Sequence, residues 1–210
     1  MKRDILAVLA DKWEDGTRPA DLYAEQIAAR PRDYLDAILS GLASKNKRVQ
    51  GGCAELASLL SAEHPALLYP HVDVFVANLG AKAPILRWEA VCTLGNLAKV
   101  DRKKVLPEHV DTMAGLLASQ SIVLQGHAVR ALAKIAQQYP ALAGRILAAL
   151  LRSEPRFPGS RVGYVVEAME AFASRPSLAP TVRGFLARHA ESEHAPVARK
   201  AKRALKMMGA

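Results

Sequence analysis

The chain contains 210 residues with a mass of 22.6 kDa, so it is long enough to bury a sizeable core without disulfides or structural metals. Half of its residues are apolar and 23% are charged, a composition typical of folded rather than disordered proteins. Alanine and leucine together supply 65 residues, whereas aromatic residues make up only 5%. Because this balance favours helices over strands, we expect an all-α fold, and the composition excludes an all-β protein.

The sequence predicts neither a secretion signal nor a membrane span. The apolar stretch 5–10 ends at Asp11 and Lys12, before the apolar core of a signal peptide would be complete. No segment approaches the roughly 20 consecutive apolar residues of a membrane-spanning helix. We therefore expect a cytoplasmic protein without membrane contact. Cys53 and Cys92, the only cysteines, lie in helix-like apolar patterns and are predicted to be reduced core residues rather than a disulfide.

The formal net charge of +9 is unevenly distributed. It amounts to −2 in residues 1–40, +4 in 41–107, +1 in 108–155 and +6 in 156–210. The last segment contains a basic patch, without acidic neighbours in the sequence, that consists of Arg199, Lys200, Arg203 and Lys206. Such a patch favours an acidic partner, whether a protein, a nucleic acid or an anionic surface.

An apolar pattern recurs five times, at intervals of 36 to 38 residues. Its positions are offset by 0, 4, 5, 8 and 11 residues from starts at Val49, Leu86, Leu124, Arg161 and Val197. At 3.6 residues per turn, these offsets place the side chains on one face of a helix. At offset 5 the last copy has Lys202 where the others are apolar, which predicts a C-terminal capping repeat; alternatively, the lysine extends its stem along the surface.

Each repeated helix follows a second amphipathic segment, and prolines mark the breaks, so the repeating unit is predicted to be a helical hairpin. The twelve predicted helices form six pairs, at 2–14 with 19–29, 33–43 with 46–62, 66–80 with 84–98, 108–118 with 121–138, 141–152 with 159–174, and 177–190 with 194–208. The first pair is acidic, contains Trp13 and departs from the pattern. Residues 1–32 are therefore expected to form an atypical N-terminal cap on a repeat array at 33–210, within one continuous domain.

The segment from Leu86 to Leu97, LRWEAVCTLGNL, resembles the second helix of a HEAT repeat, with an aliphatic residue, an arginine, two variable positions, two small apolar residues, and then Leu-Gly and Leu. The copy that begins at Leu124 follows this form more loosely, with Gln125 in the arginine position. The resemblance covers about residues 33–208 and implies a right-handed α-α superhelix of about five helical hairpins plus the N-terminal pair. It indicates architecture rather than one function, because such solenoids serve many roles.

The polar face of the repeated helices is the candidate binding surface. In HEAT-like solenoids this side lines a concave groove, which the resemblance implies for this chain. The candidate binding residues lie two, three or six positions after a repeat start and are Trp88, Glu89, His127, Arg130, Tyr164 and Glu167. A further row, ten positions after each start, contains Leu59, Asn96, Lys134, Ala171 and Met207. Such a mixed surface suits an extended or helical polypeptide better than a small metabolite.

Trp88 has two interpretations. The equivalent residues of three other copies are Gly51, Gly126 and Gly163, which carry no side chain. The tryptophan can therefore protrude from the surface and act as a binding anchor. Alternatively, the glycines allow the hairpins to pack closely and Trp88 fills the gap that they leave. The charged residues on this face have the simpler interpretation of a solvated surface.

The sequence lacks the motifs of the common enzyme classes. It contains no HExxH, no CxxC pair, no phosphate-binding glycine motif and no nucleophile elbow. His189 and Glu193 are four residues apart and are interpreted as a polar pair at a helix end rather than a metal site. HEAT-type hydroxylases carry repeated His-Glu steps, whereas here the order is Glu-His. We therefore expect neither an enzyme nor a bound metal or cofactor.

Two functions from different classes fit these observations. The first is a non-enzymatic scaffold that binds a protein or peptide partner, of acidic character, through its concave face. The alternative is nucleic-acid binding, since DNA-alkylation-repair glycosylases use a HEAT-like solenoid and the C-terminal segment is basic. A role as a subunit of a larger assembly, through the N-terminal pair, also remains open, as does a monomer.

Overall fold

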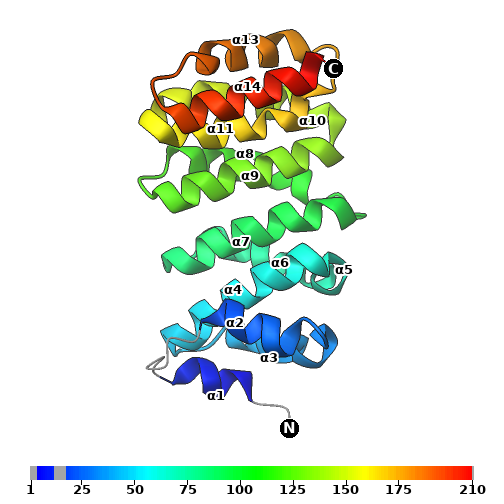
Figure 1. Ribbon diagram of the computed structural model, residues 1–210. Helices are drawn as coiled ribbons and strands as arrows, with labels where there is room; N and C mark the ends of the chain where they lie inside the picture. The colour runs from blue at the N-terminus through cyan, green and yellow to red at the C-terminus, as the bar shows by residue number, and fades with distance from the viewer. Residues whose placement is uncertain (1–3, 12–17, 210) are drawn as a thin grey trace. The chain divides into compact units, whose positions relative to one another are not determined.

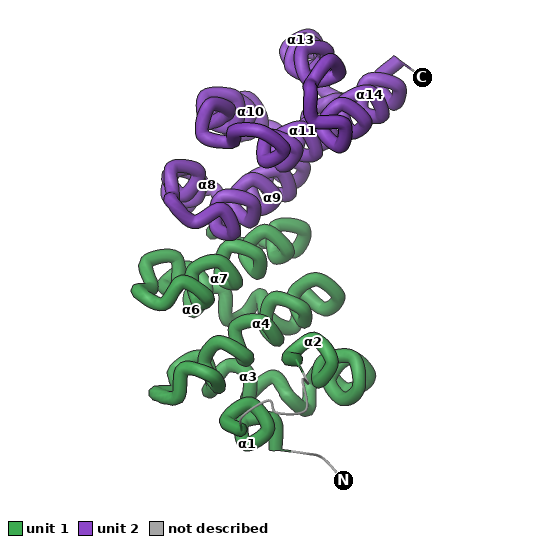
Figure 2. Tube along the Cα trace, turned by 60° about the vertical axis from the view of Figure 1, so that its left-hand side comes forward, with its two compact units in different colours: residues 1–105 green, residues 106–210 purple. Residues whose placement is uncertain are grey.

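The computed structural model describes residues 4–11 and 18–209, and every regular element in these ranges is a helix. The prediction of an all-α fold is therefore confirmed for the described residues. Trp13 lies outside them. The chain divides into two compact units, residues 1–105 and 106–210 (Figure 2). The predicted boundary between cap and array at residue 32 falls inside the first unit, where α1 (Ile5–Ala10) packs against α3 (Leu35–Gly41) and α4 (Lys47–Glu63).

The helices of both units follow the predicted pairs (Figure 1), except that α1, predicted to reach residue 14, ends at Ala10, where Asp11 adopts an extended conformation. Unit 1 also contains α2 (Pro19–Leu22), which continues into a π-helical turn at Tyr23–Ile27, then α5 (Pro65–Leu68), α6 (Val72–Asn78) and α7 (Pro84–Leu97). Unit 2 contains α8 (Leu106–Gly115), α9 (Ile122–Gln138), α10 (Pro140–Ser153), α11 (Gly163–Ala168), α12 (Glu170–Ala173), α13 (Ala179–Ala190) and α14 (Ala195–Gly209).

Two predicted helices are interrupted. The helix predicted at 66–80 is divided by the 3-10 turn Tyr69–His71, because Pro70 cannot donate the backbone hydrogen bond that a helix interior requires. The helix predicted at 159–174 begins as a 3-10 turn and is then divided into α11 and α12. Gly159, at its start, has a φ of 65°, a conformation that glycine adopts without strain.

Within each unit, the second helices of the hairpins lie side by side. In unit 1, α4 packs against α7, while α3 and α6 pack behind them. In unit 2, α11 packs between α9 and α14, while α10 packs against α9 and α13 against α14 (Figure 2). This arrangement buries the repeated apolar face, and neither Leu94 of α7 nor Leu132 of α9 retains exposed surface.

Lys202 is the one residue at its position in the repeat that is not apolar, and the sequence pattern predicts that it is not buried. The four equivalent residues are buried and apolar, namely Ala54, Val91, Val129 and Val166. The Lys202 side chain is 61% exposed, and its amine lies 3.9 Å from the Glu191 carboxylate. The charge therefore stays in solvent rather than in the core.

Small residues allow the helices of unit 1 to approach closely, and Gly41 provides a test. A Cβ atom at this position would overlap the Cys53 sulfur of α4 and lie 3.2 Å from Cys53 Cβ. We expect Gly41→Ala to lower the free energy of unfolding by about 1–3 kcal/mol, because overpacking forces the neighbouring atoms to shift. Urea unfolding followed by circular dichroism measures the change.

Gly184, exposed in α13, is the matched control, since no atom lies within 4 Å of the position that a Cβ would take. Gly184→Ala should raise the free energy of unfolding by about 0.5–1 kcal/mol, because alanine loses less backbone entropy on folding. Effects of equal sign and size at the two glycines would contradict the close packing of α3 on α4.

Candidate functional site

The sequence-predicted residues are distributed over both units. Trp88 and Glu89 lie on α7 of unit 1, beside α4. The other candidates lie on the second helices of unit 2, with His127 and Arg130 on α9, Tyr164 and Glu167 on α11, and the basic patch on α14.

The unit 1 surface is centred on a partly buried carboxyl group. The pKa of Glu89 is raised to about 7, mainly by burial and also by the nearby Glu55 carboxylate, while hydrogen bonds with Ser58 and Trp88 oppose the shift. The pKa of Glu55 is also raised, first by burial and then by Asp21, against the charge of Arg18. The two carboxyl groups therefore resist ionising together, and the Trp88 side chain is engaged with one of them.

Polar groups beside these carboxyls hold α4 and α7 together. The Asn96 amide donates hydrogen bonds to the Ser61 hydroxyl, at 2.8 Å, and to the Ser58 carbonyl, at 3.3 Å. One turn later, the Lys99 amine donates to the Ala62 carbonyl at 3.3 Å. Asn96, predicted from its row to face a groove, thus bridges two helices. Such a contact was not predictable from one helix alone.

The glycines equivalent to Trp88 lie at helix contacts. A Cβ atom at Gly51 would be 3.2 Å from Ile85 of α7, one at Gly126 would be 3.4 Å from the Tyr164 ring, and one at Gly163 would be 3.6 Å from Val197. These glycines therefore let side chains of the next helix approach the backbone. Trp88 itself is half-buried.

The unit 2 surface begins with an aromatic residue stacked between two helices. The Tyr164 ring of α11 covers Gly126 of α9, and the Arg130 guanidinium lies over the same ring, 4.9 Å from its centroid. His127 is half-buried beside them. Burial lowers the pKa of His127, and the charge of Arg130 lowers it further, so the imidazole is disposed to be neutral at neutral pH.

Carboxylates of α11 and α12 neutralise part of the basic patch. Lys200 forms an ion pair with Glu167, and Arg203 lies 3.6 Å from Glu170. Arg199 and Lys206 are exposed, and neither forms an ion pair with another described residue. The charged side chains of α14 that are available to an external partner are therefore all cationic.

His189 pairs with a different residue from the one that the sequence indicated. Its Nε2 lies 2.9 Å from the Glu154 carboxylate, which the Arg188 guanidinium also approaches at 3.3 Å. Glu154 follows α10, so this cluster ties α10 to α13 rather than joining His189 to Glu193. Within residues 4–11 and 18–209, no group of three or more His, Cys, Asp or Glu side chains has the arrangement of a metal site.

The two cysteine side chains are both at least partly shielded from solvent. Cys53 is buried and Cys92 half-buried, and both are reduced. Burial raises the pKa of the Cys53 thiol to about 12, which leaves it protonated and unreactive. None of the helices in the described part of the chain combines the length and the apolar character needed to cross a membrane.

No protein-family model and no curated protein matches the chain. Solved structures do match it. A designed armadillo repeat protein in complex with the peptide (KR)4 is 15% identical and has a TM-score of 0.70; the match covers 99% of this chain and 100% of that one. A second designed armadillo repeat protein is 15% identical over 98% of this chain and 99% of that one, with a TM-score of 0.66. An engineered protein is 20% identical over 98% of this chain and 88% of its own, with a TM-score of 0.68.

At these identities the likeness concerns the fold alone, and it places the chain in the all-α helical-repeat class. The architecture predicted from the resemblance to HEAT repeats agrees with these armadillo-type structures. Membership of the HEAT family itself stays a prediction.

The Glu89 carboxyl provides a test of the unit 1 surface. Between pH 4.5 and about 7, folded Glu89 keeps a proton that the unfolded chain has lost, so its contribution to stability falls as the pH rises through this window. Glu89→Gln removes this titration. We compare the two proteins by the difference in melting temperature, variant minus unsubstituted. This difference is expected to be larger above pH 7 than below pH 4.5. The lowered pKa of His127 acts in the opposite direction, but it is common to both proteins and cancels in the comparison.

Glu25→Gln, at an exposed position of the same unit, is the charge-matched control. It should follow the pH dependence of the unsubstituted protein. If the Glu89→Gln curve ran parallel to that of the unsubstituted protein across the window, Glu89 would not be the buried acid described above.

Proposed function

We propose that this chain is a non-enzymatic helical-repeat scaffold that binds an acidic segment of a protein partner on the unit 2 surface formed by α9, α11 and α14. The observation that carries the proposal is the composition of α14, which contains five cations and no carboxylate. They are Arg199, Lys200, Lys202, Arg203 and Lys206. An exposed amphipathic helix of this kind attracts a polymer of opposite charge and accelerates its association.

The rest of the surface supports a polypeptide as the ligand. Tyr164 and Arg130 present a rigid ring and a guanidinium on neighbouring helices, the residue types that most often anchor protein interfaces. The Glu167 carboxylate beside Lys200 can accept hydrogen bonds from backbone amides of a bound segment. Mixed donors and acceptors of this kind suit a peptide chain.

The designed armadillo structure with its bound (KR)4 peptide is a precedent for peptide binding on this type of fold. Its ligand is basic, whereas unit 2 of this chain has 14 basic and 7 acidic residues. The partner proposed here therefore has the opposite charge. Unit 1 is nearly balanced, with 15 basic and 13 acidic residues, and its Trp88 and Glu89 are proposed as a secondary contact for the same class of partner.

The favoured ligand is a polypeptide rather than a nucleic acid. Binding to a phosphate backbone requires several unpaired cations on one face, and a carboxylate between them repels the phosphates. On this surface, the carboxylates of Glu167 and Glu170 form ion pairs with Lys200 and Arg203. Duplex DNA is therefore a comparison ligand in the experiment below.

The test uses a fluorescein-labelled peptide of alternating glutamate and glycine, with fluorescence anisotropy as the measurement. We expect binding that weakens as salt is added. Arg199→Glu with Lys206→Glu should reduce the affinity roughly tenfold, equivalent to about 1.4 kcal/mol, because it reverses two exposed charges without breaking an ion pair.

Lys45→Glu with Lys82→Glu reverses two exposed cations of unit 1 and is the matched control; it should leave the affinity within about twofold. An equal loss in both double variants would mean that net charge alone drives binding and would contradict the α14 surface. Tighter binding to duplex DNA than to the peptide, with a steeper salt dependence, would favour the nucleic-acid alternative.

A further inference from the structure

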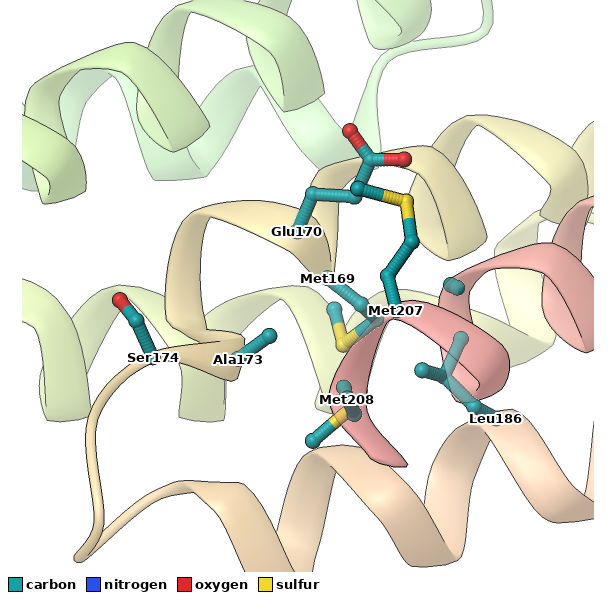
Figure 3. A pocket seen from close by; sticks show the side chains of 8 residues that line it. Met169, Glu170, Ala173, Ser174, Leu186, Met207 and Met208 are labelled. Carbon is teal, nitrogen blue, oxygen red and sulfur yellow. The ribbon is translucent and has the colours of Figure 1, made fainter. Parts of the chain in front are cut away.

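A methionine-lined pocket opens beside the basic patch in unit 2. Its walls come from α12, α13 and α14, and it contains three of the five methionines of the chain, with a volume of about 300 Å³. The lining residues are Met169, Glu170, Ala173, Ser174, Leu186, Ala204, Met207 and Met208. Figure 3 shows Met207 of α14 and Glu170 of α12 projecting in the same direction, with Met169 and Met208 below them in the view.

The pocket is held open by the packing of its walls. The Arg183 guanidinium of α13 donates a hydrogen bond to the Met208 carbonyl at 3.2 Å, which fixes the last turn of α14 against α13. Leu186 and Ala204 are buried and provide an apolar base. The alanines at 173 and 204 leave space that longer side chains at these positions would fill. The space is therefore built by facing helices rather than by a surface loop.

Among the described residues, Met207 is the most exposed of the large apolar side chains, at 65%, compared with 47% for Val123. Methionine side chains are flexible and polarisable, so a surface lined by several of them adapts to partners of different shape. A volume of about 300 Å³ is at the lower end of the range for small-molecule sites and suits one or two side chains.

The charged residues near the pocket indicate the charge of a ligand whose apolar side chain could enter it. Arg203 pairs with Glu170, which itself lines the pocket, and the exposed Lys206 immediately precedes Met207 in α14. An apolar side chain that enters here therefore lies near two cations of α14, of which Arg203 is paired with Glu170 and Lys206 forms no ion pair with another described residue. Acidic residues next to it in the same ligand are complementary to these cations.

We propose that the pocket receives an apolar side chain of an acidic polypeptide bound along α14. This inference rests on the proposed function, since the same helix supplies the cations, and it adds an apolar anchor to an interaction otherwise made of charges. The ligand is then an acidic segment with an interspersed leucine, methionine or phenylalanine rather than a purely acidic run. Burial of the side chain against Met207 provides the selectivity.

The test compares two labelled peptides of equal charge. One alternates glutamate and glycine, and in the other a central glycine is replaced by leucine. We expect the leucine peptide to bind roughly tenfold more tightly to the unsubstituted protein, the effect of burying one large apolar side chain. Met207→Ala and Ala173→Leu, which respectively remove a wall and fill the space, should each bring the ratio of the two affinities close to one.

Val123→Ala is the matched control, because Val123 is an exposed apolar residue of unit 2 on α9, outside the pocket. It should keep the full preference for leucine. A second readout is oxidation by dilute hydrogen peroxide, followed residue by residue with mass spectrometry. The leucine peptide should slow the oxidation of Met207 at least about threefold more than the glycine peptide does at equal occupancy, because only the leucine covers the thioether.

The outcomes separate this inference from the proposed function. If both peptides bound with equal affinity, or if Met207→Ala kept the preference for leucine, the pocket would be overturned while the acidic-peptide surface stood. If neither peptide bound to the unsubstituted protein, both proposals would be overturned. Melting temperatures of all variants establish that each is folded, so a lost preference reports the pocket itself.

Discussion

The structure depends on the burial of one apolar face by each repeated helix against its neighbours within a unit. No hairpin of this length can cover that face alone, and the hydrophobic effect therefore drives the second helices together side by side. Glycine and alanine at the contacts bring the backbones close, as at Gly126 under the Tyr164 ring. Because neighbouring helices lie this close, side chains on the outward face can reach from one helix to the next.

That reach determines the chemistry of the surface. In unit 1 it allows Asn96 to bridge α4 and α7, and it partly buries the carboxyl groups of Glu55 and Glu89, so that the Glu55 charge adds to the rise in the pKa of Glu89. In unit 2 it pairs Lys200 with Glu167 and Arg203 with Glu170, so that ion pairs run across neighbouring helices. Exposed pairs of this kind contribute little to stability. Their effect is to fix the positions of the charged side chains on the packed helices.

Charges held in place on packed helices are what the proposed recognition of an acidic segment requires. The buried Cys53 is unreactive, and the cluster formed by His189, Arg188 and Glu154 ties α13 to α10. The features of unit 2 on which the proposals rest are the cations of α14, the Tyr164 ring and the methionine-lined pocket. Electrostatic attraction acts over several ångströms and sets the rate of association, whereas an apolar anchor acts only on contact and sets the lifetime of a complex. The α14 region combines both.

The sequence by itself determined the helices and which face of each is buried, because these follow from the repeat of apolar residues every three to four positions. The helices α4, α7, α9 and α14 lie within a few residues of their predicted bounds, and Lys202 is exposed as its position in the pattern indicated. Only the tertiary structure decided the partners: Tyr164 with Gly126, His189 with Glu154, and Met169 with Met207 around one pocket. Such pairs join residues more than thirty positions apart. Their meeting depends on the offset between packed helices, which a periodicity within one helix does not contain.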